Sequence, residues 1–178
     1  MNRNCAKDST ASEVMQDIFI SLGSNTGTPA DNLERAVQLL TGLPGLSVVD
    51  KSSVYLTEPQ GMKDQPWFAN QVMWMRSDGS WQPLDLLAAL KILEKKMGRT
   101  PGPRNGPRLI DLDILLFGNT VLSNSELILP HHGLKSRAFV LIPLAELCPQ
   151  LVLPDGISVE RLLHGLEFRL EGHKIFQT

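Results

Sequence analysis

This sequence has few cysteines, no long apolar run and no large excess of charge of one sign. Its two cysteines, Cys5 and Cys148, lie far apart and form neither a disulfide framework nor a metal-ligand spacing, which favours a reducing, cytoplasmic setting. No segment is apolar for long enough to span a bilayer, so we expect no membrane contact. The polar residues 1–17 resemble neither a signal peptide nor a membrane anchor and are expected to form a mobile tail.

The net charge of −2 argues against nucleic acid as a partner, because a bulk nucleic-acid binder is strongly basic. Positive charge is concentrated locally instead, since residues 91–108 contain six Lys and Arg against the single acid Glu94. Such a run is typical of a solvated helix face followed by a loop. It is also what a phosphate site requires, so the interpretation depends on the residues that follow.

Several common catalytic motifs are missing as well. The P-loop motif Gly-x-x-x-x-Gly-Lys-Ser/Thr does not occur, and residues 23–27 form only a short turn after a strand. The neighbouring His131 and His132 do not indicate a zinc site, because adjacent side chains diverge and no cysteine or acid accompanies them at zinc spacing. No obvious pair of Ser and His or Cys and His indicates nucleophilic catalysis.

Hydrophobic periodicity predicts an α+β fold. The expected elements are a strand at 18–22, a helix from Pro29 to Gly42, β-rich runs at 46–56 and 68–76, a helix from Pro83 to Gly98 and a strand at 110–117. This order is the split βαβ pattern of ferredoxin-like βαββαβ folds, in which helices pack on one face of an antiparallel sheet. Residues 18–178 are expected to form a single domain.

The chain after Gly118 is less regular and is expected to form a C-terminal extension. Short strands are predicted near 121–122 and 151–153. Short helices are predicted within 137–147 and 158–163, although Pro143 interrupts the first of these patterns.

The strongest chemical signal is an acid pair inside an apolar strand. Because successive strand side chains alternate faces, Asp111 and Asp113 project from one face about 7 Å apart, while Leu112 faces the other way. Two carboxylates at this spacing suit one or two Mg²⁺ ions, and the preceding Arg104 and Arg108 suit the phosphate oxygens that such ions bridge. The alternative is an exposed strand end with solvated acids.

The segment from Gly106 to Leu115, Gly-Pro-Arg followed by Asp-Leu-Asp-Ile-Leu, resembles the signature of the 6-hydroxymethyl-7,8-dihydropterin pyrophosphokinases. These folate-pathway enzymes transfer pyrophosphate from ATP to a pterin alcohol. Residues 20–25, 64–70 and 130–139 resemble three further segments of the same family, so the resemblance covers roughly residues 18–156. The family's ferredoxin-like fold agrees with the order of elements inferred above.

The resemblance implies that Asp111 and Asp113 bind two Mg²⁺ ions that bridge the ATP phosphates. It implies that Phe68 and Phe139 stack on the two sides of the pterin ring, although an isolated Phe is more often core. Asn70 would offer a donor and an acceptor to the amide-like edge of the pterin. The other residues implied for the pterin pocket are Thr57, Pro59 and Gly61.

Basic side chains dominate the implied ATP site and the implied catalytic set. The residues implied for ATP binding are Glu94, Arg99, Arg108, Ile114, His131, Lys135 and Arg137. Those implied for catalysis are Arg99, Arg104, Arg108, Asp111 and Asp113. The loop over residues 98–107 is expected to be a lid, less charged than in many members because Thr100-Pro101-Gly102-Pro103 replaces basic residues. Asn105 and His132 stand where Trp and Tyr are usual.

The expected function is therefore an ATP-dependent diphosphokinase that acts on 6-hydroxymethyl-7,8-dihydropterin, with Mg²⁺ as cofactor. Positioning and preorganised charge would supply most of the barrier reduction, without a strong base. The alternative is a non-catalytic, ferredoxin-like module that binds a nucleotide or small molecule. ATP and the pterin are the expected partners, and no obligate protein partner is expected.

Overall fold

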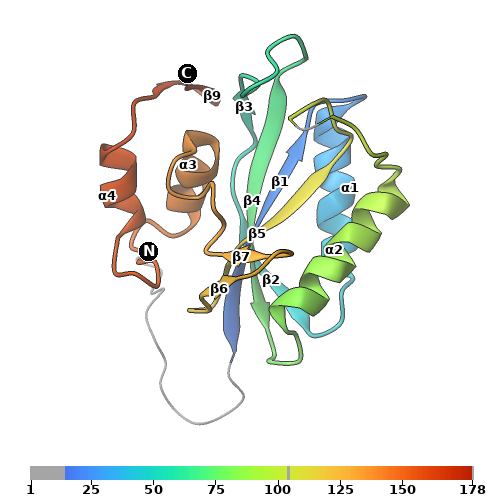
Figure 1. Cartoon of the computed structure of the whole chain (residues 1–178), viewed down its shortest axis with the longest axis vertical. Helices are drawn as coiled ribbons and strands as arrows, with labels where there is room; N and C mark the ends of the chain where they lie inside the picture. The colour runs from blue at the N-terminus through green and yellow to red at the C-terminus, as the bar shows by residue number, and fades with distance from the viewer. Residues whose placement is uncertain (1–14, 104, 178) are drawn as a thin grey trace.

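The computed structural model describes residues 15–103 and 105–177 (Figure 1). Cys5, Arg104 and most of the expected tail lie outside this part, although Gln16 and Asp17 already belong to the first strand. The described elements are β1 (Gln16–Ser24), α1 (Pro29–Thr41), β2 (Leu46–Lys51), β3 (Tyr55–Thr57), β4 (Phe68–Ser77), α2 (Pro83–Met97), β5 (Asp111–Phe117), β6 (Leu122–Ser123), β7 (Ile128–Leu129), α3 (Ala138–Leu147), α4 (Val159–His164), β8 (Arg169–Glu171) and β9 (Lys174–Phe176).

One sheet with the strand order β5-β1-β4-β3-β9-β8 forms the centre of the molecule, and β2 also pairs with β4. The strands pair antiparallel except for β3 with β9. The predicted order of strand, helix, strand, strand, helix, strand is confirmed up to β5. The β-rich run at 46–56 is divided into β2 and β3, both of which pair with β4.

The two helices of the predicted core, α1 and α2, cover one face of the sheet, and α3 and α4 of the C-terminal part cover the other (Figure 1). Ile18, Ile20 and Leu22 of β1 belong to the core beneath α1 and α2. Phe19, between them, belongs with Trp74 of β4 to a second core beneath α3 and α4. Because the side chains on both faces of β1 are apolar, both faces of this strand must be buried by packing against helices.

The two helices predicted from apolar stripes are present. The buried residues of α1 are Leu33, Ala36, Val37 and Leu40, and those of α2 are Leu86, Leu90, Leu93, Glu94 and Met97. Pro stands in the first turn of both helices, where its missing N–H leaves no bond unmade. Gly98 ends α2 with a φ of 99°, a left-handed conformation that glycine adopts at little cost.

The C-terminal part contains more structure than the sequence predicted. The antiparallel pair β8 and β9 was not expected, and β9 extends the main sheet by pairing with β3. The predicted helix around residues 137–147 is present as α3 and continues through Pro143. Cys148, the C-cap residue of α3, is buried. None of the described helices is long and apolar enough to cross a membrane.

Candidate active site

A cavity lies on the sheet face that α3 covers, beyond the apolar part of that face. The register aligns Gly23 of β1 with Asn70 on one side and with Asp111 on the other, so all three lie at one level of the sheet. The cavity is lined by Ser21, Gly23, Thr57, Glu58, Gln60, Phe68, Asn70, Asn105, Arg108, Asp111, Asp113, Arg137 and Phe139. The sequence did not indicate Ser21, Glu58 or Gln60 as site residues.

The acid pair occupies the strand face predicted for it. Leu112 and Ile114 are buried in the core beneath α1 and α2, whereas Asp111 and Asp113 line the cavity on the opposite face. The alternative of an exposed strand end with solvated acids is therefore not supported. Ile114, which was expected at the ATP site, is only 1% exposed, and the structure does not bring its side chain to the cavity.

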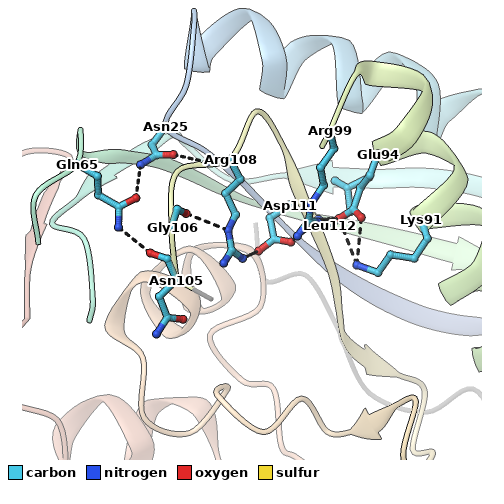
Figure 2. A network of polar contacts seen from close by, with 10 residues as sticks. All are labelled: Asn25, Gln65, Lys91, Glu94, Arg99, Asn105, Gly106, Arg108, Asp111 and Leu112. Carbon is cyan, nitrogen blue, oxygen red and sulfur yellow. Dashed lines mark hydrogen bonds and ion pairs between the residues drawn. The ribbon is translucent and has the colours of Figure 1, made fainter. Parts of the chain in front are cut away.

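Asp111 is held by two arginines, as Figure 2 shows. Arg99 Nη1 lies 2.6 Å from Asp111 Oδ1, and Arg108 Nη1 pairs with the other carboxylate oxygen. Burial alone would raise the pKa of Asp111, but the two neighbouring guanidinium groups outweigh it and hold the pKa below its usual value. Asp111 is therefore ionised at neutral pH without a bound cation.

Asp113 lies in a different electrostatic environment. Burial, followed by the negative charge of Asp111, raises the pKa of Asp113 to about 6. A bound cation would relieve both effects, because it neutralises the two carboxylates together. Within the described residues, no group of three or more His, Cys, Asp and Glu could hold a metal ion. Mg²⁺ binds through one or two carboxylates and takes its other oxygens from water and substrate phosphates, so the chemistry of this acid pair fits that ion.

Glu94, expected to contact ATP, is not among the residues that line the cavity. Its side chain is 4% exposed and accepts a hydrogen bond of 2.7 Å from the backbone N–H of Leu112. It also pairs with Arg99 and lies 3.2 Å from Lys91 Nζ. Glu94 therefore connects α2 to the acid strand and holds Arg99 against Asp111 (Figure 2).

The other wall of the cavity combines a buried polar pair with two aromatic rings. Asn70 Nδ2 donates a hydrogen bond of 2.7 Å to Thr57 Oγ1, and both residues are buried. Gly23 permits this arrangement, since a Cβ there would lie 3.1 Å from Asn70 Oδ1. Phe68 and Phe139 line the same cavity. The arrangement brings together the aromatic and polar groups predicted for a flat heterocycle.

Pro59 and Gly61, also expected in the pterin pocket, lie in a neighbouring hollow instead. Both line this second hollow together with Gln65, Trp67 and Gln177. Glu58 and Gln60 line both spaces. The loop between β3 and β4 thus forms a wall between the cavity and the hollow.

Two loops meet beside the cavity through hydrogen bonds that the sequence did not predict. Asn25 Nδ2 donates to Gln65 Oε1 over 3.0 Å, and Asn25 Oδ1 accepts from the backbone N–H of Arg108 over 2.8 Å. Gln65 Nε2 donates to the backbone oxygen of Asn105 over 2.7 Å (Figure 2). The described part of the expected lid is therefore tied to the loop that precedes β4.

The residues expected near the nucleotide are only partly brought to the cavity. Arg137 lines it, with its guanidinium carbon 5.6 Å from the centre of the Phe139 ring. His131 is partly buried, and its pKa is lowered to about 4 by burial and then by the neighbouring charges of His132 and Arg137. Its imidazole is therefore neutral at pH 7. Lys135 is paired with Asp155 away from the cavity lining.

The sequence is similar to known proteins over most of its length. The sequence pattern of the family described as 7,8-dihydro-6-hydroxymethylpterin-pyrophosphokinase (HPPK) matches residues 19–149. A 2-amino-4-hydroxy-6-hydroxymethyldihydropteridine pyrophosphokinase of Pseudomonas aeruginosa is 42% identical over 155 residues, which cover 87% of this chain and 94% of the relative. A protein of the same name from Bacillus subtilis is 41% identical over 148 residues, or 83% of this chain and 87% of the relative.

Solved structures show the same fold at low sequence identity. The crystal structure of an HPPK-DHPS in complex with substrates superposes with a TM-score of 0.66 and 13% identity, over 84% of this chain and 45% of that chain. Plasmodium falciparum HPPK-DHPS with pteroate superposes with a TM-score of 0.67 and 13% identity, over 94% of this chain and 48% of that chain. At this identity the likeness concerns the fold alone.

Proposed function

This chain belongs to the 7,8-dihydro-6-hydroxymethylpterin-pyrophosphokinase family, and on this premise we propose how its cavity performs the family's reaction. The chain transfers a diphosphate group from ATP to the hydroxymethyl group of 6-hydroxymethyl-7,8-dihydropterin, giving AMP and the pterin diphosphate in folate biosynthesis. One observation carries this assignment. A single cavity is lined by a same-face acid pair, an arginine beside it, two phenylalanines and a buried asparagine amide.

In the reaction, the hydroxymethyl oxygen forms a bond to the β-phosphorus of ATP. The bond from that phosphorus to the oxygen it shares with the α-phosphate breaks, and AMP leaves with that oxygen. Two Mg²⁺ ions held by Asp111 and Asp113 would supply neutralisation of the phosphate charge. Because phosphoryl-type transfer depends mainly on positioning and preorganised charge, a strong protein base is not required.

Arg99 and Arg108 are already placed around the acid pair by their contacts with Asp111. With a cation on the acid pair, Arg99 and Arg108 would turn their guanidinium groups from Asp111 to phosphate oxygens. Arg137 would contact the phosphates from the opposite wall. The neutral His131 Nδ1 accepts a hydrogen bond of 3.2 Å from the backbone N–H of Gly133, so its Nε2–H is left to donate to the nucleotide.

The pterin ring would lie between Phe68 and Phe139, where offset stacking stabilises a flat π-system. One Asn70 N–H is engaged by Thr57, which leaves Asn70 Oδ1 and its second N–H for the amide-like edge of the ring. Thr57, which accepts that bond, can still donate its hydroxyl hydrogen. A ring between the two phenylalanines would thus have a fixed polar partner at one edge.

For the fold, we assign residues 18–178 to one domain with a ferredoxin-like core and a C-terminal extension. The order β5-β1-β4-β2, all antiparallel, supports this assignment. The extension begins after β5 and supplies α3, which carries Phe139. The cytoplasmic location expected from the sequence stays a prediction.

The decisive experiment measures AMP formed from ATP with and without the hydroxymethyl pterin, in Mg²⁺ and in EDTA. We expect AMP only when both Mg²⁺ and the pterin are present. Asp113→Asn should abolish it, whereas Glu167→Gln, which removes an exposed carboxylate outside the cavity, should not. If the protein binds ATP but forms no AMP under any of these conditions, the enzyme assignment is refuted. The alternative, a non-catalytic binding module, is then favoured.

A further inference from the structure

The C-terminal strand β9 pairs with β3, whose Thr57 lines the substrate cavity, although β9 lies outside the part of the chain that the family pattern matches. That match ends at residue 149, whereas β9 pairs in parallel with β3 through Leu56 with Lys174 and Thr57 with Ile175. Ile175 is 1% exposed and packs in the small core formed with Tyr55, Ala138 and Ile142. This packing fixes the position of Gln177, two residues further along the chain.

The Gln177 side-chain amide connects two segments that line the cavity. Its Oε1 accepts a hydrogen bond of 2.7 Å from the backbone N–H of Ala138 and one of 3.3 Å from Gln60 Nε2. Its Nε2 donates to the backbone oxygen of Ser136 over 2.9 Å. The amide therefore uses both its oxygen and its nitrogen, and it bridges the loop after β3 and the start of α3.

These contacts surround the part of α3 that faces the substrate. Ser136 and Ala138 flank Arg137 in the sequence, and Phe139 follows Ala138. Both Arg137 and Phe139 line the cavity. The helix needs an external partner here because its own N-cap, Arg137, makes no side-chain capping hydrogen bond. An unpaired N–H in the first turn is normally satisfied by such a cap. Gln177 performs this role from a segment 39 residues away in sequence.

We infer that Gln177 is a positioning residue for the pterin side of the active site, acting through Ala138 and Ser136 on Phe139 and Arg137 and through Gln60 on the opposing loop. The inference rests on the proposed function for its effect on the pterin. The structural basis of the inference is independent of the proposed function, because the three hydrogen bonds exist without any substrate. Gln177 itself does not line the substrate cavity and is not a catalytic residue.

The first arm of the test uses the substrate-free protein and follows amide hydrogen exchange in wild type, Gln177→Ala and Gln38→Ala. Gln38 is an exposed residue of α1 that is not among the residues lining the cavity, and it serves as a matched control. We expect faster exchange at Ala138 and over residues 58–62 in Gln177→Ala alone, with exchange in α1 unchanged. Unchanged exchange at Ala138 would overturn the inference whatever the protein catalyses.

The second arm measures steady-state kinetics for both substrates. Loss of these hydrogen bonds should raise the KM for the pterin about 3- to 10-fold, the scale of one net hydrogen bond, and should raise the KM for ATP, through Arg137, by a smaller factor. Gln177→Glu keeps the acceptor for Ala138 but not the donor for Ser136, so its pterin KM should lie between wild type and Gln177→Ala. Equal increases in both KM values would overturn the inference, whereas an inactive wild-type protein would refute the proposed function instead.

Discussion

Replacing Asp113 by Asn should stabilise the metal-free protein, and the gain should depend on pH. The pKa of Asp113 is raised from 3.8 to about 6, a difference of roughly two pH units. At 1.36 kcal/mol for each unit, ionising Asp113 costs the folded state about 3 kcal/mol relative to the unfolded chain. An asparagine side chain is similar in size and cannot ionise, so we expect a gain of about 1–3 kcal/mol above pH 6.

The direction of this pH dependence follows from the raised pKa of Asp113. Because the folded-state pKa is above the unfolded value, protonated Asp113 favours folding, and this contribution is lost as pH rises from about 4 to 6. Wild type and Asp113→Asn should therefore differ little near pH 4 and most at pH 7–8. Urea unfolding in EDTA with linear extrapolation measures this difference at each pH.

Asp111→Asn provides the opposite case on the same strand. Asp111 is ionised and paired with two arginines, so its replacement removes a counter-charge from both Arg108 and Arg99, although Arg99 keeps its ion pair with Glu94. Because the Asp111 side chain is 18% exposed, we expect a loss of about 1–3 kcal/mol at pH 8, less than for a fully buried pair. A stability gain in Asp113→Asn that is equal at pH 4 and pH 8, or losses of equal size in both variants, would refute the reasoning.

Three further predictions concern the two walls of the cavity and the loops beside it. Phe139→Ala should weaken pterin binding by about 1–3 kcal/mol while ATP binding changes little; calorimetry that shows equal losses for both ligands would make this ring part of the core only. Glu94→Gln should lower the free energy of unfolding by about 1–3 kcal/mol, because Arg99 and Lys91 lose a buried counter-charge, and urea unfolding at pH 8 measures it. Gln65→Ala should speed hydrogen exchange over residues 105–107, since the bond to Asn105 is lost; unchanged exchange there would mean that other contacts hold this loop.

The elements around α1, α2 and β5 could be predicted because their sequence patterns are strong and local. Regular apolar spacing identifies one buried face of each helix, and strand alternation places Asp111 and Asp113 opposite Leu112. The covering of both sheet faces was missed, although the sequence contained a signal for it. Ile18, Phe19 and Ile20 form a continuous apolar run, which is typical of a strand buried on both sides.

Other features depend on contacts between distant segments, which periodicity does not reveal. The strands β8 and β9 are three residues each, too short to show a pattern, and β9 is recognised only by its pairing with β3. Glu94 could have been identified as buried, because it follows Leu90 by four residues on the apolar stripe of α2. Arg104 lies outside the described residues, so its predicted catalytic role stays a prediction.

The division of one sheet face into two halves has a consequence for how sequence change acts on this protein. Phe19, Val72 and Trp74 pack beneath α3 and α4, whereas Ser21, Gly23 and Asn70 on the same two strands line the cavity. A substitution in the first group reduces the amount of folded protein in a cell, because a buried core residue is lost. A substitution in the second group that leaves packing intact reduces turnover per folded molecule, so abundance and activity can change independently along a single strand.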